Sequence, residues 1–170
     1  MPLVKTPAAL EQLATRIVFF IAGFAISSWA PLVPLVRDKI GLDEGQLGTL
    51  LLCLGLGSVV TMPFAGSLAA RFGCRRTILA AGALVCLSLP CMAAAPTALL
   101  LALALFVFGA GLGTVDVVIN IQAVIVEKAA NRAMMSGFHG LYSVGGIVGA
   151  GVVTGLLSLG LTPLSAILTI

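Results

Sequence analysis

The strongest constraint on the fold is a long apolar stretch, residues 98–126, that contains a single carboxylate, Asp116. A helix of this length, at about 1.5 Å per residue, exceeds the ~30 Å hydrocarbon core of a bilayer. A carboxylate in such a helix costs about 2.5–3.5 kcal/mol on insertion scales, so groups that compensate for it are expected nearby. The stretch therefore predicts a membrane-spanning helix that carries a polar site.

One face of this predicted helix is small and polar, while the opposite face is aliphatic. The members of the polar face follow one another at spacings of three and four residues: Gly109, Gly113, Asp116, Asn120, Ala123 and Glu127. Gln122 lies off both faces, toward the aliphatic one. The asymmetry indicates that one side of the helix faces a polar site or a closely packed neighbour.

Composition extends the prediction to the whole chain. Apolar residues make up 60% and charged residues 9% of the 170 residues, against about 45–50% and about 25% in soluble domains. We therefore expect an all-α, polytopic membrane helix bundle whose surroundings are the lipid bilayer. The net charge of +3 is no sign of nucleic-acid binding. The four cysteines lack metal-site spacing with a histidine, so no metal or other cofactor is expected.

Six apolar runs follow a polar leader, residues 1–15, which is expected in the cytoplasm. The runs cover about residues 16–36, 46–70, 77–95, 98–126, 135–159 and 161–170. The first five are long enough to span a membrane. Pro31 and Pro34 predict a kink late in the first run, and Pro90 an interruption of the third.

The sixth run stops within an apolar helix, whose last carbonyl groups would lack partners in lipid. We therefore expect the sequence to be part of a longer protein that completes helix six and continues. A self-sufficient half that dimerises is the alternative.

Positive charges gather in alternate loops. If the N-terminus is cytoplasmic, seven Lys and Arg residues lie on that side and two, Arg37 and Lys39, lie outside. This distribution satisfies the positive-inside rule. Asp116 precedes Glu127 by eleven residues, which is about 16 Å along a helix and places Asp116 near the membrane midplane.

A weak internal repeat relates the first and fourth runs. Phe20–Val36 aligns without a gap on Phe106–Gln122, and with a small shift Gly57 of the second run aligns on Gly146 of the fifth. The matched runs cross the membrane in opposite directions, an arrangement that is common in secondary transporters. The matches are few and rich in glycine, so chance similarity is the alternative.

The segment Gly66–Arg76, GSLAARFGCRR, resembles the signature between helices two and three of the major facilitator superfamily. The positions that match are Gly66, Leu68, Ala69, Arg71, Gly73 and Arg75. The resemblance implies a gating loop on the cytoplasmic side, formed by Gly66, Arg71, Gly73, Arg75 and Arg76. Ala70 replaces the signature's Asp, which latches the two halves in the family, and Cys74 replaces a basic residue. Any latch here would depend on the arginines.

Within the superfamily the chain is most similar to the fucose-permease and MosC-like branch. Asp116-Val-Val-Ile-Asn120 resembles an element of helix four in fucose permeases, where the acid takes part in proton-coupled sugar uptake. Span one lacks the acid that fucose permeases place there. The resemblance implies the N-terminal half of a twelve-helix transporter of the bacterial inner membrane, whose C-terminal half is absent from this chain.

Asp116 is the first candidate for the site, as a carboxylate that binds solute or carries a proton. The alternative is a structural carboxyl group bonded to Asn120 or to another helix. Asn120 would offer a neutral donor and acceptor to a hydroxylated solute, or would join two helices.

Further candidates come from spans one, four and five. Ser27 and Ser28 would line the cavity or bond back to their own helix, and Trp29 would stack on a sugar ring or anchor the helix at the interface. His139 and Gln122, at similar depth, are candidates for a proton relay; the alternative for His139 is an interhelical hydrogen bond.

These features predict a secondary active transporter, not an enzyme, that moves a small sugar-like or polyol solute by alternating access. Proton coupling would run through Asp116. Two alternatives stay open: an exporter of drugs or metabolites from the same superfamily, and a non-transporting truncated fragment or assembly subunit.

Overall fold

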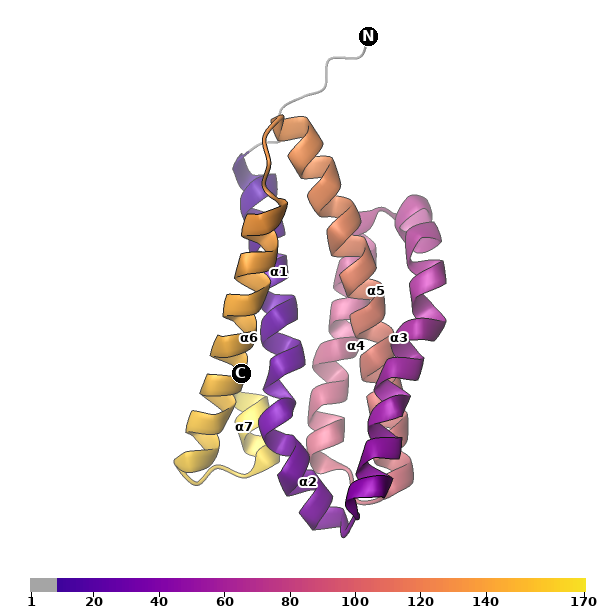
Figure 1. The fold of residues 1–170 in the computed structure, drawn as a ribbon, viewed down its shortest axis with the longest axis vertical. Helices are drawn as coiled ribbons and strands as arrows, with labels where there is room; N and C mark the ends of the chain where they lie inside the picture. Colours follow the sequence, from indigo (N-terminus) through magenta and orange to yellow (C-terminus); the bar gives the residue numbers. More distant parts are fainter. Residues whose placement is uncertain (1–8) are drawn as a thin grey trace.

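A computed structural model describes residues 9–170, and its regular elements are all helices (Figure 1). The long helices are α1 (Ala9–Ser28), α3 (Glu44–Phe72), α4 (Cys74–Ala94), α5 (Ala98–Ala130) and α6 (Met135–Ser158). The short ones are η1 (Ala30–Leu32), α2 (Val33–Ile40) and α7 (Pro163–Thr169). Within residues 9–170, five helical segments are long and apolar enough to cross a membrane, when Ala9–Ile40 is taken as one. The predicted all-α membrane bundle is confirmed.

α3, α4 and α5 are longer than the apolar runs that predicted them, whereas α6 and α7 are slightly shorter. The first helix begins at Ala9, inside the stretch expected as a leader, and residues 1–8 lie outside the described part of the chain. The predicted interruption at Pro90 is wrong, because α4 continues through that residue to Ala94. A proline removes one backbone hydrogen bond, and a membrane helix whose neighbouring turns are intact tolerates that loss.

The predicted kink in the first span is confirmed. α1 ends at Ser28, and the chain passes through the short 3-10 turn η1 before it resumes as α2. Pro31 and Pro34 lack the N–H groups that would continue the α-helical pattern, so the axis changes at this point. α2 then ends at Gly41, whose φ of 75° is a left-handed cap that glycine adopts without strain.

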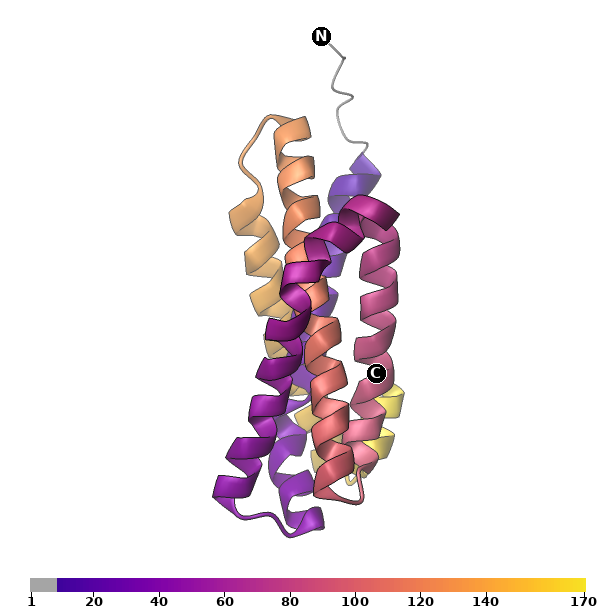
Figure 2. The ribbon, with the colours of Figure 1, turned by 90° about the vertical axis from the view of Figure 1, so that its right-hand side faces the viewer.

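The helices form two packed groups. α3 and α4 both pack mainly on α5, whereas α1 packs along α6 and touches α5 more lightly. Figure 1 shows α1 beside α6 on one side of the molecule and α3, α4 and α5 on the other, with the upper end of α5 leaning toward α6. Figure 2 shows α3 curving across α5 toward the start of α4. The contacts of α5 with α1, and those of α7 with α4, join the two groups.

The loops alternate between the two ends of the bundle. The α3–α4 and α5–α6 connections lie at the end where α1 begins, and the α2–α3, α4–α5 and α6–α7 connections lie at the other (Figures 1 and 2). The first end carries the basic loop residues Arg71, Arg75, Arg76, Lys128 and Arg132. This arrangement agrees with a cytoplasmic location for that end.

Two helix pairs are joined by the same kind of close contact. Gly57 of α3 lies against the backbone carbonyl of Phe106 in α5, and Gly145 of α6 lies against that of Phe20 in α1. A Cβ atom at either glycine would overlap the carbonyl oxygen. Small residues let membrane helices approach this closely.

A second set of contacts follows the same register. Gly109 of α5 meets the carbonyl of Leu54 in α3, and Gly23 of α1 meets that of Tyr142 in α6. The α3–α5 and α6–α1 pairs are thus built alike, as an inverted repeat requires. Gly57 corresponds to Gly145, so the alignment of Gly57 on Gly146 was wrong by one residue.

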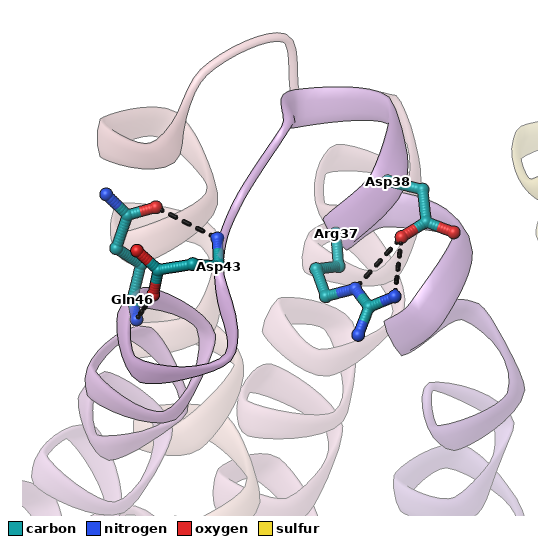
Figure 3. A network of polar contacts seen from close by, with 4 residues as sticks. All are labelled: Arg37, Asp38, Asp43 and Gln46. Atoms are coloured by element: carbon teal, nitrogen blue, oxygen red, sulfur yellow. Dashed lines mark hydrogen bonds and ion pairs between the residues drawn. The ribbon is translucent and has the colours of Figure 1, made fainter.

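At the opposite end from the basic loops, polar side chains fix the turn between α2 and α3 (Figure 3). Asp43 Oδ1 accepts a hydrogen bond of 2.7 Å from the Gln46 backbone N–H, and Gln46 Oε1 accepts one of 3.1 Å from that of Asp43. This reciprocal capping box fixes the start of α3. Arg37 pairs with Asp38 at 2.8 Å, and Lys39 Nζ donates to the Ala94 carbonyl at 2.9 Å, which caps the end of α4.

Candidate functional site

The polar face of α5 divides into three parts along the helix. Gly109 and Gly113 are covered by α3. Asp116 is exposed and Asn120 is half-buried, while Ala123 is fully buried. α3 thus covers the glycines but leaves the acid and the amide open, at the point where α5 passes between the two helix groups.

Asp116 lies near the middle of α5, 18 residues after Ala98 and 14 residues before Ala130. In the part of the chain that the structure describes, its carboxylate takes part in no hydrogen bond or ion pair. The phenol of Tyr142, on α6, lies within electrostatic range of it. The carboxylate of Asp116 is therefore unpaired among the described residues.

Asn120 lies one turn beyond Asp116 on α5. Its Nδ2 donates a hydrogen bond of 2.8 Å to the backbone carbonyl of Asp116 and not to the carboxylate. The amide therefore supports its own helix, and its carbonyl oxygen accepts no hydrogen bond from any described residue.

The three candidates on the first span lie in different surroundings. Ser27 Oγ lies 2.8 Å from the position that a Cβ of Gly146 would occupy, so this half-buried hydroxyl faces α6. Ser28 is fully buried, and its Oγ donates to the Phe24 carbonyl at 2.8 Å. Trp29 is 5% exposed, with no partner for its Nε1 among the described residues. Its ring has no open face for a solute in this conformation.

His139 and Gln122 are not brought together. His139 of α6 is exposed and meets Phe19 of α1 edge-on, with ring centroids 5.4 Å apart. Gln122 lines a cavity of about 470 Å³ among α1, α4 and α5, which also holds the charged residues Glu11 and Arg75. The structure thus places the two relay candidates in different environments.

Sequence reasoning missed several polar contacts between helices. Ser58 Oγ donates to the Gly109 carbonyl at 2.8 Å, and Thr61 Oγ1 donates to the Ala110 carbonyl at 3.0 Å, which joins α3 to α5. Tyr142 was also missed, although it is the single tyrosine of the sequence and lies in a glycine-rich span. A single polar aromatic residue among glycines was the one feature of the sequence that could have drawn attention to Tyr142.

Comparison with known proteins decides the family. The sequence model of the protein family called Major Facilitator Superfamily matches residues 16–170. The chain belongs to the major facilitator superfamily. It is 58% identical over 162 residues to an uncharacterised MFS-type transporter of Yersinia pestis, covering 95% of this chain and 42% of that protein.

Two further relatives are more distant. An uncharacterised transporter of Sinorhizobium fredii is 38% identical over 132 residues, covering 78% of this chain and 35% of that protein. The membrane protein MosC of Rhizobium meliloti is 32% identical over 131 residues, covering 77% and 32%. The chain thus spans less than half the length of each of these relatives. No solved structure matches.

The superfamily signature occupies the junction of α3 and α4. Gly73 joins the two helices with a φ of 84°, a conformation that favours glycine. Its N–H donates to the Ala69 carbonyl at 2.9 Å. The arginines of the signature diverge: the Arg71 guanidinium lies 5.2 Å from the centre of the Phe72 ring, Arg75 faces the cavity that holds Gln122, and Arg76 faces another hollow of the bundle.

Proposed function

We propose that this superfamily member contributes to a secondary transporter that moves a small polar solute, sugar-like or a polyol, by alternating access. The observation that carries the proposal is Asp116, an exposed carboxylate midway along α5 that has no hydrogen-bond or ion-pair partner among residues 9–170. Carboxylates within membrane-spanning helices are rare and commonly mark substrate paths or proton relays.

The surroundings of Asp116 suit a hydroxylated solute. The Asn120 amide oxygen is one turn away, and the Tyr142 phenol can donate or accept a hydrogen bond. Ser27 supplies a further hydroxyl on the face of α1 that packs against α6. An acid together with an amide and two hydroxyls on these helices suits a sugar or polyol better than an apolar drug.

We place the proposed proton coupling at Asp116 because its carboxylate has no cationic partner among residues 9–170. A charged carboxylate without a cation is costly at mid-membrane, and protonation removes that cost. The carboxylate would therefore bind a proton in the state that reorients across the membrane and release it where water enters. Trp29 and Ser28, which are buried in this conformation, are not needed for this scheme.

Uptake into proteoliposomes tests the proposal. The complete gene product is reconstituted with an imposed pH gradient, and accumulation of labelled pentoses, hexoses and polyols is measured. Asp116→Asn mimics the protonated acid, so we expect it to abolish accumulation driven by the gradient while solute exchange at equal pH persists. Asp38→Asn is the matched control, because Asp38 lies at the outer end of the bundle in an exposed pair with Arg37.

Two outcomes would contradict the proposal. Gradient-driven accumulation by Asp116→Asn at the wild-type rate would exclude the proton role. Transport of apolar drugs with no competition by sugars or polyols, in vesicles of inverted orientation, would favour the exporter.

A further inference from the structure

A crevice opens between α3 and α4, and Asp116 is not among the residues that line it. Its volume is about 460 Å³. Leu68 and Phe72 of α3 form one wall and Ala80 and Leu84 of α4 the other, while α5 forms the floor at Thr114. α3 and α4 pack mainly on α5 and little on each other, which leaves this space between them.

The crevice offers little to a polar ligand. The Thr114 hydroxyl donates to the Ala110 carbonyl at 2.8 Å, and the Thr61 hydroxyl donates to the same oxygen at 3.0 Å. The Thr77 hydroxyl donates to the Gly73 carbonyl at 3.0 Å. All three hydroxyls of the lining are thus satisfied by helix carbonyls, and the rest of the wall is aliphatic or aromatic apart from one arginine. An apolar chain fits such a space.

That arginine is Arg76, in the first turn of α4 at the basic end of the bundle. It is exposed, and the single ion pair among residues 9–170 is between Arg37 and Asp38, so no described carboxylate neutralises Arg76. Arg71 and Arg75 lie in the same six-residue segment, Arg71–Arg76, and add to the positive potential at the mouth.

The length of the crevice matches one leaflet. Arg76 and Leu84 are eight residues apart on α4, which is about 12 Å along the helix, and half of the hydrocarbon core is about 15 Å. Arg76 thus lies at the membrane surface, and the apolar crevice extends from it into the membrane over about the length of an acyl chain.

We propose that this crevice binds an anionic phospholipid of the cytoplasmic leaflet, with its phosphate on Arg76 and one acyl chain between α3 and α4. Charge complementarity selects this occupant, because the cytoplasmic leaflet carries the anionic lipids and basic residues at its surface attract them. The acyl chain fills the space that the two helices leave between them.

Native mass spectrometry tests the proposal on the complete gene product, released from nanodiscs of equal phosphatidylglycerol and phosphatidylcholine. The wild type is expected to retain one phosphatidylglycerol in preference to phosphatidylcholine. Arg76→Gln should weaken phosphatidylglycerol retention about fivefold, the effect of one basic residue near an anionic surface. Ala80→Trp should abolish retention by filling the slot.

The matched controls are Lys128→Gln, a basic residue at the same end, and Ala83→Trp, an exposed residue of α4 outside the crevice. Both should retain the lipid as the wild type does. Equal retention of the two lipids, or an unchanged Arg76→Gln variant, would overturn the proposal. Absence of bound lipid from the wild type, with Ala80→Trp unchanged, would indicate that protein covers the crevice and would also overturn it.

Discussion

The Asn120 side chain donates its hydrogen bond, 2.8 Å long, to the backbone carbonyl of Asp116 and leaves the neighbouring carboxylate open. The bond closes within one turn of α5, so it holds Asn120 in place without neutralising the acid. Within residues 9–170, the Asp116 carboxylate therefore has no hydrogen-bond or ion-pair partner.

Labelling of introduced cysteines tests this openness. In a variant whose four native cysteines are replaced by alanine, Asp116→Cys should react with a small water-soluble thiol reagent in native membranes. Thr114→Cys, on the same helix but 8% exposed, should react far more slowly. Equal rates at the two positions would show that the face is not open to water as the structure has it.

Substitution of a glycine at a helix crossing should destabilise the fold. A Cβ at Gly57 overlaps the Phe106 carbonyl oxygen, whereas one at Gly55 meets nothing within 4 Å. We expect Gly57→Ala to cost about 1–3 kcal/mol, as overpacking does, and to lower the thermal unfolding midpoint in detergent. Gly55→Ala should leave the midpoint unchanged or raise it slightly, because alanine favours helix. Equal unfolding midpoints for Gly57→Ala and Gly55→Ala would show that α3 and α5 do not cross as closely as the structure shows.

The inverted repeat predicts that its second copy behaves in the same way. A Cβ at Gly145 overlaps the Phe20 carbonyl oxygen, and one at Gly151 meets nothing within 4 Å. Gly145→Ala should therefore lower the unfolding midpoint by an amount similar to Gly57→Ala, with Gly151→Ala as the control. A loss at Gly57 alone would mean that the two crossings are not equivalent.

Sequence patterns predicted the helices well because length and hydropathy determine them locally. The kink after Ser28 followed from two prolines, whose missing N–H groups act within one turn. The repeat was visible but one residue out of register, since Gly145 and Gly146 are adjacent and the sequence does not show which of them meets the Phe20 carbonyl. Which glycine lies at the crossing depends on the position of the opposing helix.

The candidate site was harder to predict for the same reason. Periodicity placed Asp116 and Gly113 on one face, yet α3 covers the glycine and leaves the acid exposed. Trp29 and Gln122 could not be placed without knowing how α1 packs, and Trp29 proved to be buried. A helical pattern defines a face, whereas the neighbour that covers it depends on contacts between distant residues.

The orientation of the bundle can be tested at the junction of α3 and α4. Cys74 is half-buried at the start of α4, beside the basic loop. With the other native cysteines replaced, it should react with an impermeant thiol reagent in inverted vesicles but not in intact cells. Asp38→Cys, at the opposite end, should show the reverse in the cysteine-free protein. Reaction of Cys74 from outside would reverse the proposed orientation.

The Glu127 carboxylate holds the start of α6. It accepts hydrogen bonds of 2.6 Å and 2.7 Å from the backbone N–H groups of Met134 and Met135, where Met134 has no capping side chain of its own. An acceptor at a helix N-terminus satisfies N–H groups that have no partner within the helix. Glu127→Ala should therefore speed amide hydrogen exchange at Met134 and Met135 several-fold and leave the middle of α6 protected. Lys128→Ala, one residue on, is the matched control and should exchange as the wild type does. Unchanged exchange in Glu127→Ala would show that the carboxylate does not cap the helix in solution.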